Sequence, residues 1–521
     1  MIPLFTTEQI RKADKYAIEQ LKIPGIVLME NAALSIYNSI NRNYNLVNGI
    51  SKIGIIAGKG NNGGDAFAVA KHFVNAGFFV NVLFIGSEKE LKGDAQINFT
   101  IFQELSQKVK YGKIIFYKSK RDLVKIKNSE VLIDGLLGTG TKGEINEPYK
   151  SIINYVNNLN AFCVSIDLPS GLNLESSTGS PIINANLTIT LADFKTGLFY
   201  GNGYKFSGKI EKGSIGIGDE YFVNQIVSDY LIEPEDALLG LPKKNKSSHK
   251  YQNGKVLAIV GSGKYIGAAS LLVKALFQSG TGSAILAFPK SIRNLIATNM
   301  GETVLASYND ENKEYLAPKN ILELKYQIDW ADLITVGSGL GRQIETINAI
   351  SDIIKKFNKK RMVIDADAIY AIGEIGISKF DLRNKVLTPH HGEFSHLIGI
   401  SVEELECNIL RYGKQFAKKT KSILVLKGAP TIIFLPNGDS IINSAGNVGM
   451  AKFGSGDVLS GLISGFVANS TDMDQAVVSA VYLHSLSADL LLEKETEFGI
   501  TATKIEENIP NAISFLRNSI I

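Results

Sequence analysis

The sequence feature that most constrains the fold is a repeated alternation of short apolar, β-branched runs with amphipathic stretches. In the first half of the chain the runs are at residues 52–57, 79–85, 131–134, 162–167 and 187–191. A second series is at residues 255–260, 285–288, 333–336, 362–365, 386–388, 423–427 and 431–434. This alternation predicts βαβ units and parallel sheets, and nearly continuous apolar strands are typical of sheets buried on both faces. The sequence therefore predicts an α/β protein.

The two series of strands predict two large domains. At about 150 residues per domain the length would suggest roughly three, but the pattern breaks clearly only at residues 230–251. This stretch contains Pro234, Pro242 and a cluster of lysines, and we expect it to be a solvated linker. The boundary is placed there, giving domains of residues 1–229 and 230–521. No repeat of about 20–50 residues is present, which excludes a solenoid.

Charge and cysteine content exclude several classes of protein. The formal net charge is +4, from 55 basic and 51 acidic residues, which gives no electrostatic footprint for nucleic acid. Cys163 and Cys407 cannot build a disulfide framework or a cysteine-rich metal site, which suits a reducing compartment. No apolar run approaches about 18 residues, and the N-terminus has no signal or transit pattern. We expect a cytoplasmic homo-oligomer with small-molecule partners, no nucleic acid and no membrane.

Glycine is in excess, and its positions indicate where ligands bind. The chain has 49 glycines, about 9% against a usual ~7%. Gly58, Gly60 and Gly63 follow a strand and precede a helix expected from residue 65, an arrangement that lets a phosphate approach the backbone. The next strand ends in Gly86 without an acid to hold a ribose, which disfavours a dehydrogenase. The alternative is a tight βα turn with Asp65 near the helix start.

Two further strands of the first half end in an aspartate followed by glycines. Asp134 precedes Gly135-Leu136-Leu137-Gly138-Thr139-Gly140, and Asp167 precedes Leu168-Pro169-Ser170-Gly171. Each aspartate alone could be a helix cap. Because ligands bind at the carboxyl ends of parallel strands, we expect the three polar strand ends to face one crevice.

These three segments resemble the NAD(P)HX epimerase domain over about residues 1–220. The resemblance implies a Rossmann-like three-layer fold and interconversion of the R and S forms of hydrated NADH and NADPH. It implies Asp167 as the proton-transfer group, and Asn62, Asp134 and Ser170 as ligands of a potassium ion, for which oxygen ligands are suitable. Ala66 stands where the family often has glycine, and its methyl group could narrow the site. The implied substrate contacts, besides Asp167, are Asn61, Asn62, Gly63, Gly64, Asp65, Gly138, Thr139, Gly140, Thr141, Lys142, Gly143 and Glu144.

A glycine-rich turn near the C-terminus is the strongest site of the second half. Gly454-Ser455-Gly456-Asp457 precedes an apolar helix at residues 458–467, and its backbone N–H groups predict an anion hole. We expect the helix dipole to hold Asp457 ionised, so that it can take a proton from a hydroxyl being phosphorylated. The alternative is an ordinary helix N-terminus. Gly261-Ser262-Gly263-Lys264 is not a P-loop, because Ala258 and Tyr265 break that motif.

Other strand ends of the second half also carry polar groups. Gly337–Gly341, Asp365 and Asp367, and Lys427–Thr431 each follow a predicted strand. Thr388-Pro389-His390-His391-Gly392-Glu393-Phe394 follows another; no third suitably spaced ligand completes a metal site, and substrate contact is favoured for His390 over a structural role.

The segment at residues 388–394 and the Gly-x-Gly-Asp turn together resemble the ribokinase-like ADP/ATP-dependent NAD(P)HX dehydratases over about residues 245–510. The resemblance implies that Glu393 organises a magnesium-bound water. Val448, Lys452 and Phe453 depart from the family pattern, and Lys452 could contact phosphate or face solvent. The implied substrate contacts are Ala268, Gly339, His390 and Asp457, and the implied nucleotide contacts are Lys427, Gly428, Ala429, Pro430, Thr431 and Gly456.

Both resemblances imply one chain that repairs hydrated nicotinamide cofactors. It would epimerise (R)-NAD(P)HX, phosphorylate the C6 hydroxyl of the S form with ADP or ATP, and eliminate phosphate, with Asp457 as the base. The alternative is a true small-molecule kinase of ribokinase type with an N-terminal binding or scaffold domain. That protein would accumulate a phosphorylated product, and the segment at residues 388–394 disfavours it.

Overall fold

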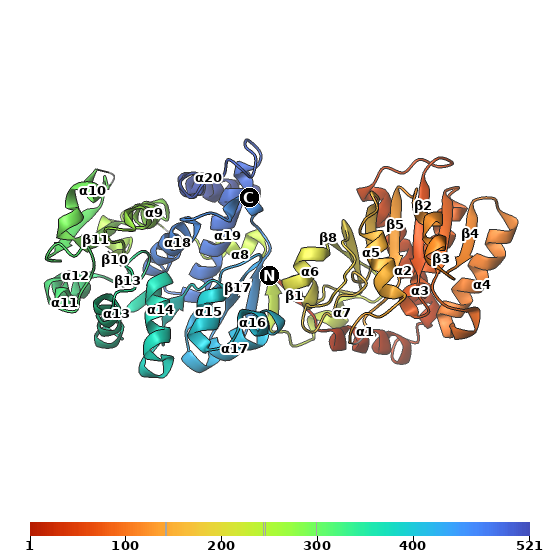
Figure 1. The fold of residues 1–521 in the computed structure, drawn as a ribbon, viewed down its shortest axis with the longest axis horizontal. Helices are drawn as coiled ribbons and strands as arrows, with labels where there is room; N and C mark the ends of the chain where they lie inside the picture. The colour runs from red at the N-terminus through yellow and green to blue at the C-terminus, as the bar shows by residue number, and fades with distance from the viewer. Residues whose placement is uncertain (141–142, 243, 245, 299, 521) are drawn as a thin grey trace. The chain divides into compact units, whose positions relative to one another are not determined.

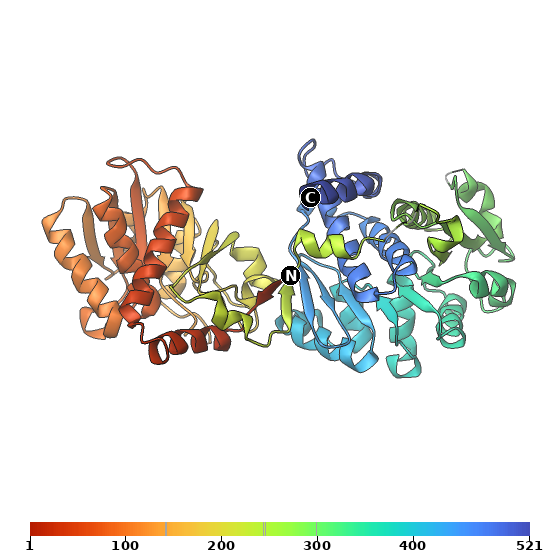
Figure 2. The ribbon, with the colours of Figure 1, turned by 180° about the vertical axis from the view of Figure 1, so that it is seen from behind.

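The chain forms two compact units, Pro3–Val227 and a second unit of Met1–Ile2 with Ser228–Ile521. The computed structural model describes residues 1–140, 143–242, 244, 246–298 and 300–520. Each unit is built on one sheet with helices on both sides, as the two opposite views show (Figures 1 and 2). The α/β class predicted from the strand pattern is confirmed.

The first unit contains a seven-stranded sheet in which every neighbouring pair is parallel. From one edge to the other the strands are β4 (Gly112–Phe116), β3 (Phe79–Phe84), β2 (Lys52–Ala57), β5 (Val131–Gly135), β6 (Phe162–Ile166), β7 (Leu187–Leu191) and β8 (Lys209–Gly213). The chain runs outward from β2 to β4, then returns to the other side of β2. The strand order therefore reverses between β2 and β5, where α/β folds bind ligands.

Helices cover both faces of this sheet and form two cores. The larger core joins the strands to α2 (Gly25–Asn43), α3 (Asn61–Asn75) and α4 (Gly93–Lys108). The other joins them to α5 (Tyr149–Val156) and the 3-10 helix at Lys120–Ile126. Within β2, Ile53 and Ile55 belong to the first core and Ile56 to the second, as strand alternation requires. The unit thus has the expected Rossmann-like three-layer fold. The other α-helices of its described residues are α1 (Thr7–Glu19), α6 (Gly201–Phe206) and α7 (Asp219–Val223).

The second unit contains an eleven-stranded sheet. In spatial order its strands are β1 (Ile2–Leu4), β9 (Asp229–Leu231), β18 (Ser440–Asn443), β17 (Thr431–Phe434), β16 (Ile423–Leu426), β15 (Lys385–Leu387), β14 (Arg361–Ile364), β13 (Leu333–Val336), β10 (Lys255–Ile259), β11 (Ser283–Pro289) and β12 (Val304–Tyr308). The strands from β16 to β12 are parallel to their neighbours, whereas β17 is antiparallel to both β16 and β18. The parallel strands therefore end at one common edge.

One face of this sheet packs on α9 (Ile266–Gln278), α18 (Ser455–Asn469), α19 (Met473–Leu491) and α20 (Ala502–Ile520). The other face carries α13 (Ile344–Lys356), α14 (Ala366–Ile375), α15 (His391–Ile398) and α17 (Ile409–Thr420) (Figure 1). The remaining helices are α8 (Pro234–Leu239), α10 (Arg293–Ala297), α11 (Asn320–Glu323), α12 (Lys325–Trp330) and α16 (Val402–Cys407). This three-layer arrangement leaves the carboxyl edge of the parallel strands to the loops.

The structure differs from the sequence-based expectation in two places. The helix after β2 begins at Asn61 rather than Asp65, so Asn61–Asp65 form its first turn. The stretch at residues 230–251 is not simply a solvated linker, because β9 and α8 lie there and Ala237 and Leu241 are buried in the core of the second unit. Here apolar burial outweighs the prolines and charged residues that suggested a linker.

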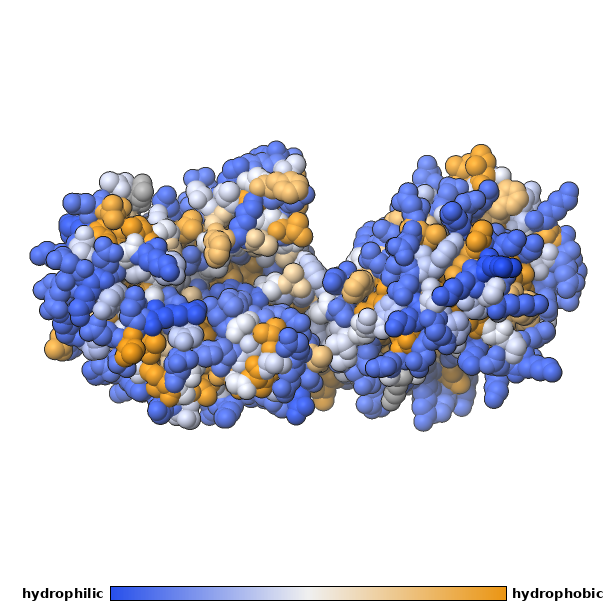
Figure 3. Space-filling view, in the orientation of Figure 1, coloured by the Kyte–Doolittle hydropathy of each residue, from blue (hydrophilic) through white to orange (hydrophobic). Residues whose placement is uncertain are grey.

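Apolar side chains are mainly interior. On the face drawn in Figure 3, hydrophilic residues cover most of each unit and apolar residues appear in small groups. Among the described residues, no helix is both long and apolar enough to cross a bilayer.

Candidate functional sites

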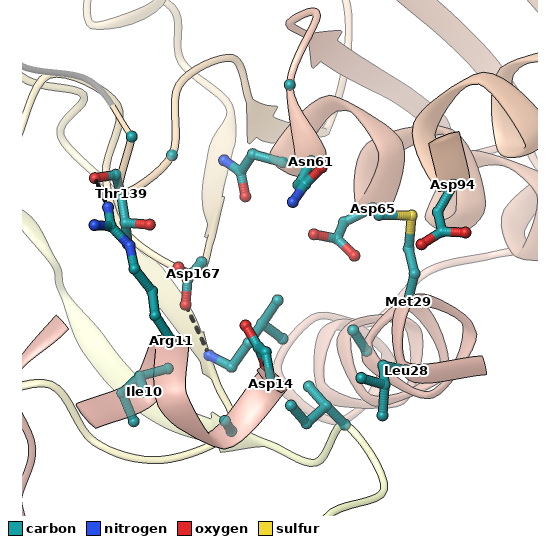
Figure 4. A pocket seen from close by; sticks show the side chains of 18 of the residues that line it. Ile10, Arg11, Asp14, Leu28, Met29, Asn61, Asp65, Asp94, Thr139 and Asp167 are labelled. Carbon is teal, nitrogen blue, oxygen red and sulfur yellow. Dashed lines mark hydrogen bonds between the residues drawn. The ribbon is translucent and has the colours of Figure 1, made fainter. Parts of the chain in front are cut away.

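A cavity of about 610 Å³ lies in the first unit, at the carboxyl ends of the central strands (Figure 4). The turns after β2, β5 and β6 contribute to its wall, together with α1, α2 and the segment that follows β7. Of the predicted substrate contacts, those that line it are Asn61, Asn62, Asp65, Gly138, Thr139, Gly140 and Asp167. The three polar strand ends thus share one cavity at the point where the strand order reverses, as the topology rule predicts.

The other predicted substrate contacts have different surroundings. Gly63 and Gly64 lie in the first turn of α3, where a Cβ on Gly63 would come within 1.9 Å of the Gly58 carbonyl oxygen. A Cβ on Gly64 would come within 2.8 Å of the Ala95 backbone. These glycines therefore allow close packing of α3. Gly143 and Glu144 are exposed, and Thr141 and Lys142 lie outside the described residues.

Ala66, which departs from the family pattern, does not point into the cavity. It is fully buried, and its methyl group lies 2.6 Å from where a Cβ on Gly135 would be. The methyl group therefore fills space between α3 and β5 and leaves the cavity wall unchanged.

The predicted potassium ligands converge on the turn after β5. Ser170 Oγ donates to Asp134 Oδ1 at 2.6 Å and accepts from the Leu137 N–H at 2.8 Å. Asn62 Nδ2 donates to the Leu137 carbonyl at 2.9 Å. Asp134 also accepts from Ser165 Oγ and from the Ser170 N–H. The three side chains therefore meet around one peptide unit.

Asp134 is a fully buried carboxylate without a counter-charge. None of its side chain is exposed, and no ion pair to it occurs among the described residues. Burial raises the pKa of Asp134, although the hydrogen bonds from Ser170, Leu136 and Ser165 act to lower it. A buried carboxylate surrounded by other oxygen atoms is a suitable environment for a hard cation.

Asp167 and Lys195 form a buried ion pair at the cavity wall. Lys195 Nζ donates to Asp167 Oδ1 at 2.6 Å, Thr190 Oγ1 at 2.9 Å and the Leu191 carbonyl at 2.8 Å. The Leu191 N–H also donates to Asp167 Oδ1, at 3.0 Å. Asp167 has φ +67°, a left-handed conformation that is costly for a residue with a Cβ and is found mainly at functional sites. The network thus fixes Asp167 through one oxygen.

Two further carboxyl groups face the same cavity. Asp14 on α1 and Asp65 on α3 both line it, and Figure 4 shows both side chains directed toward its interior. Burial raises the pKa of Asp14 to about 6, and it raises the pKa of Asp65 well above the usual range; the charge of Asp167 adds to both increases. The cavity is therefore an acidic, desolvated site with one buried cation.

The sequence analysis missed the contributions of Asp14, Lys195 and Arg11. Arg11 on α1 donates to the Thr139 carbonyl at 2.7 Å and joins that helix to the Gly138–Gly140 turn. Asp14 lies one helical turn after Arg11, and Lys195 follows the strand after the Asp167 strand. Nothing in the sequence indicated that α1 closes the cavity.

The sequence-predicted groups of the second unit gather at the carboxyl edge of its parallel strands. The Gly337–Gly341 turn follows β13, Asp365 follows β14, His390 follows β15 and Lys427 follows β16. A Cβ on Gly339 would lie 3.0 Å from the Ala268 Cβ, which places the start of α9 against this turn. Gly428, Ala429 and Pro430 connect β16 to Thr431, the first residue of β17.

Asp457 lies in the first turn of α18, as predicted, with Gly454 in a left-handed conformation at the N-cap. The expected effect of the helix dipole on Asp457 is not the dominant one. Burial and the charge of Asp365 raise the pKa of Asp457 to about 6. A carboxylate with this pKa is mostly ionised at neutral pH, and it is a stronger base than an ordinary aspartate.

A second buried ion pair lies beside Asp457. Lys427 Nζ donates to Asp365 Oδ1 at 2.8 Å and lies 3.4 Å from where a Cβ on Gly456 would be. Thr388 Oγ1, Ser338 Oγ and Ser460 Oγ also donate to Asp365. Burial acts to raise the pKa of Asp365, but Lys427 and the hydroxyl groups outweigh it and lower the pKa. The result is a fixed ammonium group next to the first turn of α18.

His390 and Glu393 form a capping box at the start of α15. The Glu393 N–H donates to His390 Nδ1 at 3.2 Å, and the His390 N–H donates to Glu393 Oε2 at 2.9 Å. The side chain of His390 is 60% exposed, so it remains available to a ligand. No cluster of three His, Cys, Asp or Glu suited to a metal occurs among the described residues.

Of the three residues that depart from the dehydratase pattern, the structure explains only Lys452. Lys452 Nζ donates to the carbonyl oxygens of Phe498 and Ile500, so this lysine fastens the loop before α18 instead of facing solvent freely. Asp489, which the sequence analysis missed, accepts from the Gly446 N–H and from Asn447 Nδ2 and holds the other end of the loop. Val448 and Phe453 are exposed, and nothing in the structure explains them.

Comparison with known proteins agrees with this two-unit description. Residues 25–197 match the family model described as YjeF-related protein N-terminus, and residues 256–511 match NAD(P)H-hydrate dehydratase. A ribokinase-like superfamily protein from Enterococcus faecalis is 25% identical with a TM-score of 0.50, covering 56% of this chain and 98% of that one. The fold and the two sites define the class: a two-domain α/β enzyme with a Rossmann-like unit and a ribokinase-like unit.

Full-length relatives give the family. The bifunctional NAD(P)H-hydrate repair enzyme of Moorella thermoacetica is 30% identical over 525 residues, covering 99% of this chain and 98% of that protein. The enzyme of the same name from Methanocaldococcus jannaschii is 34% identical over 516 residues, covering 96% and 91%. The chain belongs to the family of bifunctional NAD(P)H-hydrate repair enzymes.

Proposed function

We propose that this chain epimerises (R)-NAD(P)HX to (S)-NAD(P)HX in its first unit and dehydrates the S form to NAD(P)H in its second unit. The observation that carries the proposal is that one chain holds two separate aspartate-bearing sites, each at the carboxyl edge of a parallel sheet. Each unit also belongs to a different family model. Two reactions on one small molecule account for both sites.

In the first unit, Asp167 is the proposed proton-transfer group for the hydrated nicotinamide. Among the described residues, Leu191 N–H and Lys195 Nζ both donate to Oδ1 of Asp167, which would leave Oδ2 for the substrate. Asn61, Asn62, Asp65 and the Gly138–Gly140 turn would hold the dinucleotide. The side chains of Asn62 and Asp65 are buried, which strengthens their electrostatic contacts with a ligand.

The turn after β5 supports a potassium site in the first unit. Asn62, Asp134 and Ser170 would hold the ion through oxygen atoms, and the uncompensated buried charge of Asp134 fits a cation there. When bound, potassium would supply a fixed positive charge beside the substrate cavity.

In the second unit, Asp457 is the proposed base for phosphorylation of the C6 hydroxyl of (S)-NAD(P)HX. A pKa of about 6 suits removal of a proton near neutral pH. The phosphoryl group comes from ADP or ATP, and Lys427 with the first turn of α18 would stabilise its charge during transfer. Loss of phosphate from C6, together with a proton from the adjacent C5, then forms the C5=C6 double bond and restores the nicotinamide ring of NADH or NADPH.

Other residues at the same edge of the sheet are the proposed contacts for the two ligands of the second unit. Ala268, Gly339 and His390 would contact the hydrated dinucleotide, and Lys427–Thr431 with Gly456 would contact the nucleotide. Glu393, whose charge affects the pKa of Lys427, fits the role of holding a water of hydrated magnesium. When bound, magnesium would neutralise phosphate charge.

Incubation of the full chain with mixed epimers of NADHX tests the proposal. With ADP or ATP present, we expect complete recovery of NADH absorbance and one phosphate released per NADH. Without nucleotide, we expect exchange of R and S only, and replacing potassium with lithium should slow that exchange. Accumulation of a phosphorylated product without NADH would instead support a small-molecule kinase. Absence of exchange above the uncatalysed rate would refute the epimerase assignment.

A further inference from the structure

Asp14 is a carboxyl group of the first unit that no hydrogen bond or ion pair among the described residues holds. It lies on α1, which forms a wall of the 610 Å³ cavity, and its side chain points into the same space as Asp65 and Asp167 (Figure 4). Structural carboxylates in this unit are bonded; Glu211, for example, contacts Ser39, Asn43 and Lys209. A partly buried, unbonded carboxyl group facing a cavity is available for chemistry.

The charged groups around Asp14 come from several elements. Asp167 follows β6, Lys195 follows β7, Asp65 lies on α3 and Asp94 on α4, and all line the cavity. Two further cations line the cavity: Arg11 on α1 itself, whose guanidinium group is bonded to the Thr139 carbonyl, and Lys59 after β2, which is paired with Glu90. Lys195 contacts Asp167, so its charge is largely committed to that residue. Asp14 therefore faces a cavity in which carboxyl groups outnumber free cations.

Inversion of a hydroxyl-bearing ring carbon by loss and re-addition of water requires proton transfer on two faces. The hydroxyl group leaves from one face as water after it accepts a proton, and a water molecule adds to the opposite face and loses one. A single fixed carboxylate cannot serve both faces of a ring held in one orientation. A second proton-transfer group on another wall is therefore needed.

We infer that Asp14 is this second catalytic residue, acting on the face of the hydrated nicotinamide opposite to Asp167. Protonated Asp14 gives its proton to the C6 hydroxyl of the R form, the C6–O bond breaks, and the ring nitrogen lone pair forms a C=N bond. Water then attacks C6 from the other face, and Asp167 takes its proton. Water is released and taken up once each, no oxidant is needed, and proton exchange with solvent restores both carboxyl groups. This inference rests on the proposed epimerase function.

The environments of the carboxyl groups agree with these roles. Burial and the charge of Asp167 raise the pKa of Asp14, with Lys195 acting in the opposite direction, to about 6, so Asp14 can both hold and release a proton near neutral pH. Burial, together with the charges of Asp167 and Asp14, raises the pKa of Asp65 well above its usual range. Asp167 keeps the fixed contact with Lys195. Carboxyl groups with different environments thus have different roles.

The test is Asp14→Asn in the full chain, with (R)-NADHX as substrate, no nucleotide, and the epimers separated by chromatography. We expect kcat/KM for epimerisation to fall about 10²–10³-fold, while nucleotide-dependent dehydration of (S)-NADHX stays at the wild-type rate. Glu19→Gln is the matched control, because Glu19 is an exposed carboxylate of the same helix, paired with Lys15. It should leave both reactions unchanged.

The pH dependence gives a second measurement that does not depend on the Asn variant being folded. Wild-type kcat/KM for the R form should decrease as pH rises above about 6, because Asp14 must be protonated to act as the acid. Asp14→Glu should keep this dependence at a lower rate, and Asp14→Asn should lose it. Epimerisation by Asp14→Asn within threefold of wild type, a change confined to KM, or a wild-type profile flat near pH 6 would each overturn the inference. No epimerisation by wild type would refute the proposed function itself, and the inference with it.

Discussion

Each unit has a buried lysine–aspartate ion pair at the carboxyl edge of its parallel strands. The two pairs differ in which residue, the lysine or the aspartate, is held by several hydrogen bonds to its surroundings. In the first unit Lys195 Nζ is 2.6 Å from Asp167 Oδ1, and in the second Lys427 Nζ is 2.8 Å from Asp365 Oδ1. Lys195 uses its three protons on Asp167, Thr190 and Leu191. Asp365 instead has its two oxygens filled by four donors.

The difference shows how the same ion pair can serve two chemistries. The member with complete hydrogen bonding positions the other, which keeps capacity for a ligand. Lys195 thus positions a carboxylate, which suits proton transfer. Asp365 positions an ammonium group, which suits a phosphoryl group, and the proposed base is a separate residue, Asp457. Substitutions at the two edges can test this division.

The largest effect is expected for Asp457→Ala. Removing the proposed base should lower nucleotide-dependent recovery of NADH from (S)-NADHX by about 10³–10⁴-fold, because the neighbouring carboxylate of Asp365 cannot replace it. Asp365 is filled by its own donors. Epimerisation of the R form without nucleotide should remain at the wild-type rate. Recovery of NADH within tenfold of wild type would show that Asp457 is not the base.

Asp167→Ala should give the reciprocal result in the first unit. We expect epimerisation of (R)-NADHX to fall about 10²–10⁴-fold, since the carboxylate that Lys195 positions is gone, while dehydration of (S)-NADHX is unchanged. The measurement uses the R and S forms separately, with chromatographic analysis. Loss of both activities would contradict the independence of the two edges and indicate that the variant is misfolded.

The sequence predicted much of the fold and fewer of the interactions at the sites. Strands buried on both faces have a strong apolar pattern, so β2, β7 and β13 have the predicted bounds. Edge strands such as β4 and β8 alternate with exposed residues and were not predicted.

At the sites, the glycine turns and the aspartates after strands could be predicted, because the glycines that shape each turn and the polar residues beside them are neighbours in the sequence. The partners Asp14, Lys195 and Asp489 were not visible, because the fold brings them in from remote parts of the chain. The raised pKa of Asp457 could not be predicted for the same reason. The sequence shows its helix N-terminus, whereas its burial and its proximity to Asp365 exist only in the folded chain.

Lys195→Met is expected to act mainly on stability. Removing one member of a buried ion pair leaves an uncompensated charge, and we expect the free energy of unfolding of the first unit to fall by about 3 kcal/mol. Lys195 is 1% exposed and makes three bonds, so few rearrangements could compensate. Lys212→Met is the control, because its contact with Asp193 is 3.5 Å and partly exposed; the expected change is below about 1 kcal/mol. Equal losses in the two variants, measured by denaturant unfolding, would contradict the special position of Lys195.

The smallest effect is a gain in stability for Asp457→Asn. Because the pKa of Asp457 is raised from 3.8 to about 6, its ionised form is less stable in the folded protein than in the unfolded chain. The cost is absent below about pH 4 and develops as pH rises through about 6; each pKa unit corresponds to about 1.4 kcal/mol. Asparagine should therefore stabilise the second unit by about 2–3 kcal/mol at pH 7.5 and by almost nothing at pH 4. Exposed Glu493→Gln should change neither value. A gain in stability that does not depend on pH would mean that packing, rather than charge, accounts for it. The ionised form of Asp457 would then not be destabilised in the folded protein.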